Sequence, residues 1–288
     1  MIEDYKSILE KQLWNVADTL RGKMNADEFR DYILGFIFYK YLSEKMELFA
    51  NNILQDTPVQ FRALTIAHPE RDLYLSQIQE EAVEELGYFL KPEELFSVIA
   101  KRGNGDTGEV GLFNAGKPQF ILGDLQEVLK NIEKSTMGKE SEEEFANLFE
   151  EMDLNSTKLG KKPEEKNEII AKVLAHLDKI DFKLEQDSVD VLGDAYEYLI
   201  GKFASGAGKK AGEFYTPQQI SSVLAKIVTT GKHQLKSVYD PTCGSGSLLL
   251  RIKKNVKAVN MFYGQEMNRT TYNLARMNMI MHGVHFQQ

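Results

Sequence analysis

The stretch Tyr239-Asp240-Pro241-Thr242-Cys243-Gly244-Ser245-Gly246-Ser247 decides the fold of the second part of this 288-residue chain. A short apolar run ends at Tyr239, two glycines follow, and a helical pattern restarts at Ser247. This order predicts a strand that ends in a glycine turn, after which a helix begins. Such a turn offers backbone N–H groups and a helix N-terminus, and it lets a ligand approach the backbone closely.

The flanking residues extend this unit into alternating strands and helices. We expect a strand at 237–240, a helix at 247–256 and a second strand at 259–265. Asn268 is predicted to cap a further helix that runs to Met281, just before Gly283. This alternation is typical of an α/β sheet with parallel strands.

Upstream of the turn, two more helices are predicted. The later one has Thr216 as its cap, Pro217 at its first position and Gln219 completing a capping box. Its apolar residues predict one buried side: Ile220, Val223, Leu224, Ile227 and Val228. The earlier helix starts near Val189 and is expected to end at Gly201, where a flexible basic loop over 201–210 begins.

Residues 1–165 are predicted to be helical almost throughout. Asn25 and Glu28 have the spacing of a capping box. The run behind them places a broad aromatic face at helical intervals: Phe29, Tyr32, Ile33, Phe36, Ile37 and Tyr41. We expect this face to pack in a helical bundle rather than to bind a ligand. Residues 101–108 predict a surface loop, because no P-loop lysine follows their last glycine.

Composition is that of a soluble globular protein, with 42% apolar and 27% charged residues. No run reaches the length of a membrane span, and the N-terminus lacks the layout of a signal peptide, so we expect a cytoplasmic protein. The single cysteine, Cys243, excludes an internal disulfide and a cysteine-rich metal site.

Charge is divided unevenly along the chain. Residues 201–288 hold 12 Lys and Arg against 3 Asp and Glu, whereas residues 1–200 hold 23 against 40. The two parts therefore carry +9 and −17, which sum to the net charge of −8. Such a split is typical of a protein with one part that meets a polyanion, but an ordinary solvated surface explains it equally well.

Gly244 and Gly246, with Glu266 roughly 20 residues further on, have the spacing of a nucleoside-binding site. The turn would accommodate the ligand, and the carboxylate would accept hydrogen bonds from ribose hydroxyls. A dinucleotide site would have a third glycine where this chain has Leu249, so NAD fits poorly. The residues alone are compatible both with a ribose-binding site and with a tight turn that binds no ligand.

Three segments in this order together resemble the cofactor site of DNA amino-methyltransferases. Residues 240–249 are similar to the S-adenosylmethionine turn of that family. Residues 212–217 resemble the segment that, in its adenine-N6 group, folds over the methionine end of the cofactor, and 263–266 resemble the strand end that holds the ribose. Residues 20–44 also resemble the helical leader of the modification subunits of type I restriction–modification systems.

The resemblance implies an α + α/β chain. A helical, subunit-docking domain over 1–165 would precede the first part of a Rossmann-like methyltransferase domain over 166–288. S-adenosylmethionine would donate a methyl group to adenine N6 in DNA, without a metal. The implied partners are DNA, a separate specificity subunit that reads the sequence, a second modification subunit and the restriction subunit, with no membrane.

The resemblance also implies a role for individual residues. Six would line the methionine moiety: Glu213, Phe214, Tyr215, Thr216, Pro217 and Gln218. Four would contact the cofactor through the turn: Thr242, Cys243, Gly244 and Gly246. Asp240 would orient the turn or the amino-acid group, and Glu266 would hold the ribose.

Two residue types in this region are not expected to react or to bind metal. Nothing in the sequence near Cys243 supplies a base, so a nucleophilic role is not expected. His282 and His285 fit a polar helix end better than a metal site.

The chain departs from the family in one informative way. Adenine-N6 methyltransferases carry an Asp/Asn-Pro-Pro-Tyr/Phe segment that bonds the target amino group and stacks on the flipped base. That segment is absent here, and residues 240–243 do not replace it. We therefore expect the N-terminal part of a longer subunit, inactive alone. A helical assembly module without cofactor affinity and a methyltransferase for RNA or protein remain alternatives.

Overall fold

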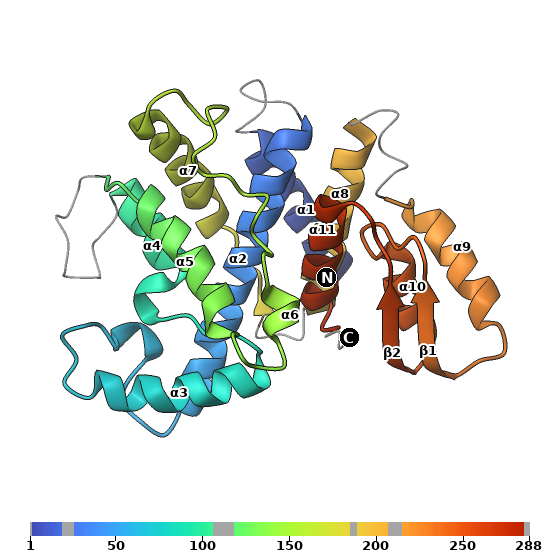
Figure 1. The fold of residues 1–288 in the computed structure, drawn as a ribbon, viewed down its shortest axis with the longest axis horizontal. Coiled ribbons are helices and arrows are strands. Elements are labelled where there is room, and N and C mark those ends of the chain that lie inside the picture. The colour runs from blue at the N-terminus through green and yellow to red at the C-terminus, as the bar shows by residue number, and fades with distance from the viewer. Residues whose placement is uncertain (1, 19–25, 106–117, 185–188, 207–214, 285–288) are drawn as a thin grey trace. The chain divides into compact units, whose positions relative to one another are not determined.

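The structure, a computed structural model, describes residues 2–18, 26–105, 118–184, 189–206 and 215–284 (Figure 1). The chain divides into two compact units, one of residues 15–186 and one of residues 1–14 together with 187–288. A boundary at 165 and 166 would fall inside the helix Pro163–Asp178, which lies wholly in the first unit.

The unit of residues 15–186 is helical wherever it has regular structure among its described residues. Its helices are α2 (Ala26–Ile53), α3 (Arg71–Glu85), α4 (Phe96–Asn104), α5 (Leu122–Ser135), α6 (Glu142–Phe145) and α7 (Pro163–Asp178), with short 3-10 turns at Phe61–Ala63 and Pro92–Glu94. Helix α2 packs against α3, α4 and α7. The aromatic face predicted on α2, from Phe29 to Tyr41, is at most 5% exposed, which confirms its place in a bundle core. Asn25, its predicted cap, lies outside the described residues.

The loop predicted at 101–108 is wrong in its first half. Helix α4 continues to Asn104, and Gly105 ends it in the left-handed conformation, at φ 77°. Gly103 serves close packing, because a Cβ there would lie 2.7 Å from the Ile121 side chain. Residues 106–117 lie outside the described part of the chain.

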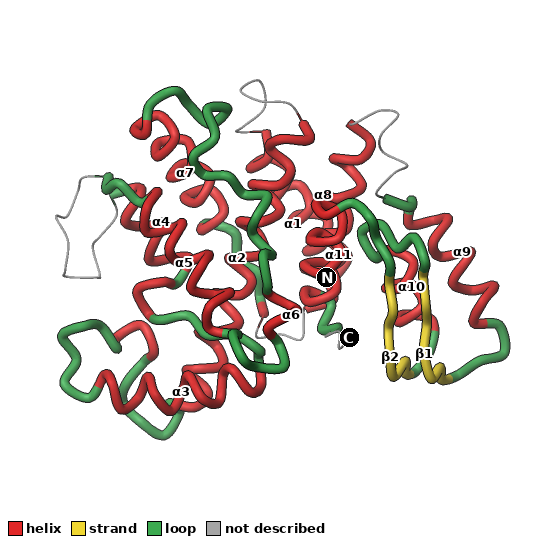
Figure 2. Tube along the Cα trace, in the orientation of Figure 1, coloured by secondary structure: helices red, strands yellow, loops and turns green. Residues whose placement is uncertain are grey.

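The second unit contains helices and a small parallel sheet (Figure 2). Its elements are α1 (Ile2–Asp18, up to Trp14), α8 (Val189–Gly206), α9 (Gln218–Thr229), β1 (Gln234–Asp240), α10 (Ser247–Asn255), β2 (Ala258–Gly264) and α11 (Arg269–Met281). The two strands pair in parallel with Val238 opposite Phe262 and Asp240 opposite Gly264, as the alternating pattern predicts. Asn268 caps α11 by accepting a hydrogen bond from Thr271 N at 3.0 Å, also as predicted.

Two predicted helix ends are wrong. Helix α8 passes through Gly201 to Gly206, so the part of the predicted loop over 201–206 is helical, and its remainder lies outside the described residues. Gly201 makes room for another residue instead, since a Cβ there would lie 2.9 Å from the Tyr215 hydroxyl. Helix α9 has Pro217 as its N-cap without a side-chain cap hydrogen bond, so the predicted cap by Thr216 does not form.

The side of α9 that was predicted to be buried is exposed. Its apolar side chains are between 41% and 64% exposed: Ile220, Val223, Leu224, Ile227 and Val228. The helix instead packs on α10, and its buried residues are the small Ser221, Ala225 and Thr229. Helical periodicity identifies a face that is suited to burial, but among the described residues no element covers it.

Within the described ranges, every helix is too short or too polar to cross a membrane.

Gly193→Ala should destabilise the second unit. A Cβ at Gly193 would lie 2.7 Å from Cε1 and Nε2 of His282, whose side chain is 1% exposed. Overpacking of this kind costs about 1–3 kcal/mol, which outweighs the ~1 kcal/mol that alanine gains in a helix. Urea unfolding followed by the fluorescence of Trp14, which lies against Phe203 of α8, measures the loss.

Gly123→Ala is the matched control, because a Cβ there meets nothing within 4 Å on α5. Far-UV circular dichroism should show unchanged or slightly higher stability for it. Equal stability of both variants would contradict the packing described for Gly193.

Candidate functional site

The carboxyl ends of β1 and β2 are joined by backbone hydrogen bonds. Gln265 N donates to Asp240 O at 2.9 Å, and Cys243 N donates to Gln265 O at 3.0 Å. The turn after β1 therefore lies directly beside the end of β2. Because the strands are parallel and in register, the residues that follow them meet at one edge.

The turn itself depends on two left-handed glycines. Gly244 has φ 55° and Gly246 has φ 82°, a conformation that a side chain strains. Gly246 N donates to Cys243 O at 2.9 Å, and Thr242 N donates to the Asp240 carboxylate at 3.0 Å. Gly246 is also the N-cap of α10, without a side-chain cap hydrogen bond. The first N–H groups of α10 therefore face the turn, where they suit a negatively charged or polar ligand.

Glu266 follows β2 and is fixed by its own loop. Its Oε1 accepts a hydrogen bond from Asn268 N at 2.7 Å, and Asn268 in turn caps α11. The carboxylate is thereby oriented next to the turn, where it can accept hydrogen bonds from a polyhydroxyl ligand.

A cavity of about 390 Å³ lies at this edge of the sheet. It is bounded by Tyr239, Cys243, Gly246, Leu249, Phe262, Tyr263, Gly264, Gln265, Tyr272, Ala275, Arg276 and Met279. The walls are mainly aromatic and aliphatic, with backbone polar groups at the turn, which is the usual composition of a small-molecule site.

The predicted cofactor residues fall into three groups. Cys243 and Gly246 line the cavity. Four others lie in the turn or at the strand end beside it, outside the lining: Asp240, Thr242, Gly244 and Glu266. The remaining six run from residue 213 to 218. Tyr215, Thr216, Pro217 and Gln218 lie outside the lining, and Glu213 and Phe214 lie outside the described residues.

The described part of that segment is anchored to α8. Tyr215 is half-buried over Gly201, while Thr216 and Pro217 are exposed. Burial, together with the charge of Glu197, raises the pKa of the Tyr215 phenol above its ordinary value. Gln218 begins α9.

Several cavity residues were missed from the sequence. Phe262, Tyr272 and Met279 lie on β2 and α11, where their apolar character fits ordinary core packing. The signal that was available is the alternation along β2, which puts Phe262 on the face of the sheet that packs against Leu249 and Met279.

Cys243 is a protonated thiol. Burial raises its pKa to about 11, and the nearby carboxylates of Asp240 and Glu266 act in the same direction. Since the thiolate is the nucleophile, this supports the expectation that Cys243 is a small turn residue and not a reactive group.

A buried cluster joins α8 to α10 and α11. Ligand-type atoms of Asp194, Glu197 and His282 lie within 4.8 Å of one another. Both carboxylates already have cationic partners, because Asp194 pairs with Lys254 and with Lys6 at 2.9 Å, and Glu197 pairs with Arg251. Burial acts to raise the pKa of Asp194, but the His282 ring and the two lysines lower it well below its ordinary range. A metal ion would have to displace these cations, so the cluster is best described as an ion-pair network.

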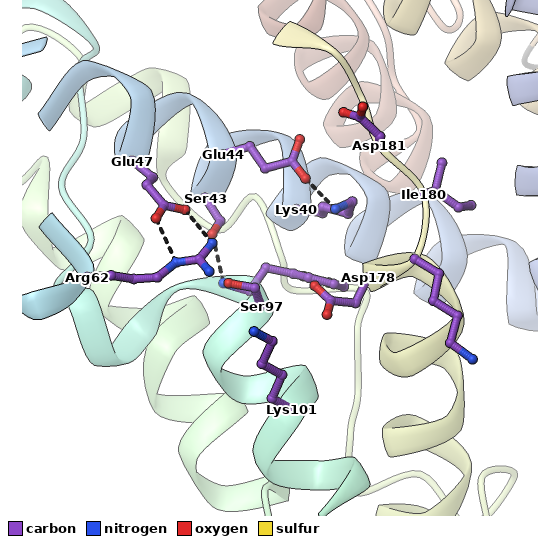
Figure 3. A pocket seen from close by; sticks show the side chains of 12 residues that line it. Lys40, Ser43, Glu44, Glu47, Arg62, Ser97, Lys101, Asp178, Ile180 and Asp181 are labelled. Atoms are coloured by element: carbon purple, nitrogen blue, oxygen red, sulfur yellow. Dashed lines mark hydrogen bonds and ion pairs between the residues drawn. The ribbon is translucent and has the colours of Figure 1, made fainter. Parts of the chain in front are cut away.

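The unit of residues 15–186 has its own cavity, of about 290 Å³ (Figure 3). Charged side chains line it, and several are paired with each other: Glu47 with Arg62 at 2.6 Å, and Lys40 with Glu44. Lys40 also lies over the ring of Phe182, at 4.8 Å from its centroid. Because charged side chains of both signs line it, the charge of this cavity does not select a class of ligand.

Cys243 should alkylate slowly in the folded chain. With a pKa of about 11, its thiolate fraction at pH 7.5 is lower than that of an ordinary thiol by roughly 100-fold. Iodoacetamide labelling followed by mass spectrometry measures the rate, and the urea-unfolded chain is the control because Cys243 is the single cysteine. Equal rates in the two states would contradict the burial of the thiol.

Comparisons with known proteins match most of the chain to one family. Residues 9–177 match the HsdM N-terminal domain and residues 187–288 match the N-6 DNA Methylase family. The type I restriction enzyme MpnII methylase subunit of Mycoplasma pneumoniae is 36% identical over 96% of this chain and 50% of its own length. The MjaIX methylase subunit of Methanocaldococcus jannaschii is 26% identical over 95% of this chain and 45% of its own length.

Solved structures agree. The type I restriction–modification methyltransferase subunit from Streptococcus thermophilus superposes with a TM-score of 0.78 at 38% identity, covering 97% of this chain and 56% of that one. A chain from a study of type I restriction–modification complex assembly has the same fold, with a TM-score of 0.52 at 20% identity over 98% of this chain and 50% of its own. This chain thus spans about half the length of the relatives it matches.

Both family matches, the curated relatives and the similar structures point the same way, and the chain belongs to the family of type I restriction–modification methylase subunits, whose N-terminal portion it matches.

Proposed function

We propose that this chain carries the cofactor part of an adenine-N6 DNA methyltransferase of the type I restriction–modification class. The observation that supports this most strongly is the meeting of the glycine turn with the Glu266 strand end over the 390 Å³ cavity. The family of the chain supports N6 methylation of DNA as the reaction. S-adenosylmethionine is the donor that we propose.

The residues around the turn fit the chemical groups of that donor. The N–H groups at the start of α10 suit a polar group at the turn, and Glu266 suits the two ribose hydroxyls. The aromatic wall formed by Phe262, Tyr263 and Tyr272 suits a purine ring. When bound, the cofactor supplies an electrophilic methyl group. The role of this chain is to bind the cofactor and to orient it.

The segment before α9 completes the proposed site. We place Glu213 to Gln218 at the methionine end, as the family resemblance implies, and Asp240, Thr242 and Gly244 in support of the turn. Tyr215 packs over α8, so this segment is tied to the same unit as the turn. The sheet then corresponds to the start of a Rossmann-like domain.

We infer the partners from the relatives and from charge. DNA suits the net charge of +9 over residues 201–288. We propose a separate specificity subunit, a second modification subunit and a restriction subunit, as expected for a type I complex, with the helical residues 1–165 as the docking domain. Such a complex acts on cellular DNA, so we place it in the cytoplasm.

Glu266→Ala should weaken binding of S-adenosylmethionine, measured by calorimetry, by about 10- to 100-fold, because hydrogen bonds to a charged group contribute ~1.5–3 kcal/mol. Glu266→Gln keeps an oxygen for Asn268 N and isolates the effect of the charge. Glu140→Ala, at an exposed position of the other unit, is the control and should bind as the unchanged chain does.

Unchanged affinity in both Glu266 variants would contradict the ribose role. If the unchanged chain binds no S-adenosylmethionine at all, the chain has no cofactor function of its own. The alternative of a helical assembly module would then replace the proposal.

A further inference from the structure

We propose that Asn278, on α11, is a positioning residue that sets the conformation of the glycine turn. Its side chain is fully buried, and its Nδ2 donates to the backbone carbonyl of Ser245 at 2.9 Å. Ser245 stands between the left-handed Gly244 and Gly246. The inference rests on the proposed function, because it assigns Asn278 a part in the same cofactor site.

The hydrogen bond fixes one peptide plane. The carbonyl of Ser245 and the N–H of Gly246 belong to the same planar unit. Asn278 holds the oxygen end, and Cys243 O accepts from the N–H end at 2.9 Å. Glycine tolerates positive and negative φ almost equally, so a peptide next to it can flip unless it is held. Asn278 therefore blocks the flip that would change which backbone groups face the ligand.

The orientation of the amide follows from its acceptor. If the side chain were rotated by half a turn, Oδ1 would face the carbonyl of Ser245 and the two oxygens would repel each other. In the present orientation Oδ1 is buried without a hydrogen-bond partner among the described residues. A buried acceptor left without a partner costs about 1–3 kcal/mol. An apolar residue would avoid this cost, so packing alone does not account for an amide here.

The contacts of helix α11 hold Asn278 in place beside the turn. The helix starts at the Asn268 cap, two residues after Glu266, so one element links the proposed ribose carboxylate to the hydrogen bond between Asn278 and Ser245. His282 Nδ1 lies 2.9 Å from Asn278 O, and Lys253 of α10 donates to His282 O. Met279 approaches the turn from the same side, within 3.3 Å of the position a Cβ on Gly246 would take.

The variant Asn278→Asp tests the hydrogen bond to Ser245 O, because its carboxyl can donate that bond only when it is protonated. A neutral aspartic acid can donate its O–H to Ser245 O, whereas the ionised carboxylate repels that carbonyl. We expect the variant to keep the turn intact at pH 5.5 and to lose it as the pH rises to 8.5. Asn278→Leu has a similar size and no proton to donate, so its defect should be the same at every pH.

Two measurements report on the conformation of the turn and on its ability to bind the cofactor. Hydrogen exchange by NMR gives the protection of Gly246 N–H, corrected for the intrinsic pH dependence of exchange, and calorimetry gives the affinity for S-adenosylmethionine. Both should fall by at least ~10-fold in Asn278→Asp between pH 5.5 and 8.5. Several charged and titratable groups lie on this side of the unit: His282, Asp194, Glu197, Arg251, Lys253, Lys254 and Arg276. The unchanged chain, measured over the same range, accounts for their titration.

The possible outcomes distinguish the role of Asn278 in the turn from the proposed binding of the cofactor. The proposal is overturned if Asn278→Leu, which cannot donate to Ser245 O at any pH, protects Gly246 as the unchanged chain does, or if Asn278→Asp keeps that protection at a pH where NMR shows its carboxyl to be ionised. A chain that protects Gly246 but binds no S-adenosylmethionine refutes the proposed function, and the exchange data still decide the role of Asn278. If the aspartate variant does not fold, normal Gly246 protection in Asn278→Leu overturns the proposal, and lost protection with an unchanged melting temperature supports it.

Discussion

The parallel register of β1 and β2 is the constraint on which the candidate site depends. Asp240 stands opposite Gly264, and the hydrogen bonds from Gln265 N and Cys243 N extend this pairing beyond the strands into the turn. A slip of β2 by one residue would turn its side chains to the opposite face of the sheet and move Glu266 away from the turn. The cavity, the oriented carboxylate and the position of the α10 N-terminus at the turn all follow from that register.

The far side of the turn is held by helices of the same unit. Ion pairs connect α10 to α8 through Lys254 with Asp194 and Arg251 with Glu197, and Asn278 connects α11 to the turn itself. Buried ion pairs contribute little net stability compared with apolar packing, but they are costly to break one-sidedly. They favour a single arrangement of these helices, which is what a preorganised binding turn requires.

Local signals in the sequence predicted the helices and strands. They failed where contacts between elements determine the structure. The strand–turn–helix unit, the Asn268 cap and the α2 core depend on turn chemistry and periodicity, and the structure confirms them. Gly201 and Gly103 were misread as helix breakers because their purpose is close contact with Tyr215 and Ile121, which sequence spacing does not reveal. For α9, periodicity identified the apolar face correctly, but whether a face is covered depends on what packs over it. The aromatic wall of the cavity was missed because core and binding aromatics have the same pattern.

The most direct test of the account is an amide NMR titration of the chain with S-adenosylmethionine. We predict that the amides at the carboxyl ends of the strands shift first and most, above all Gly244, Gly246 and those next to Glu266, while residues 26–105 are unaffected. Shifts confined to the helical unit around the cavity of Lys40 and Arg62, or no shifts at saturating ligand, would contradict a cofactor site at the glycine turn.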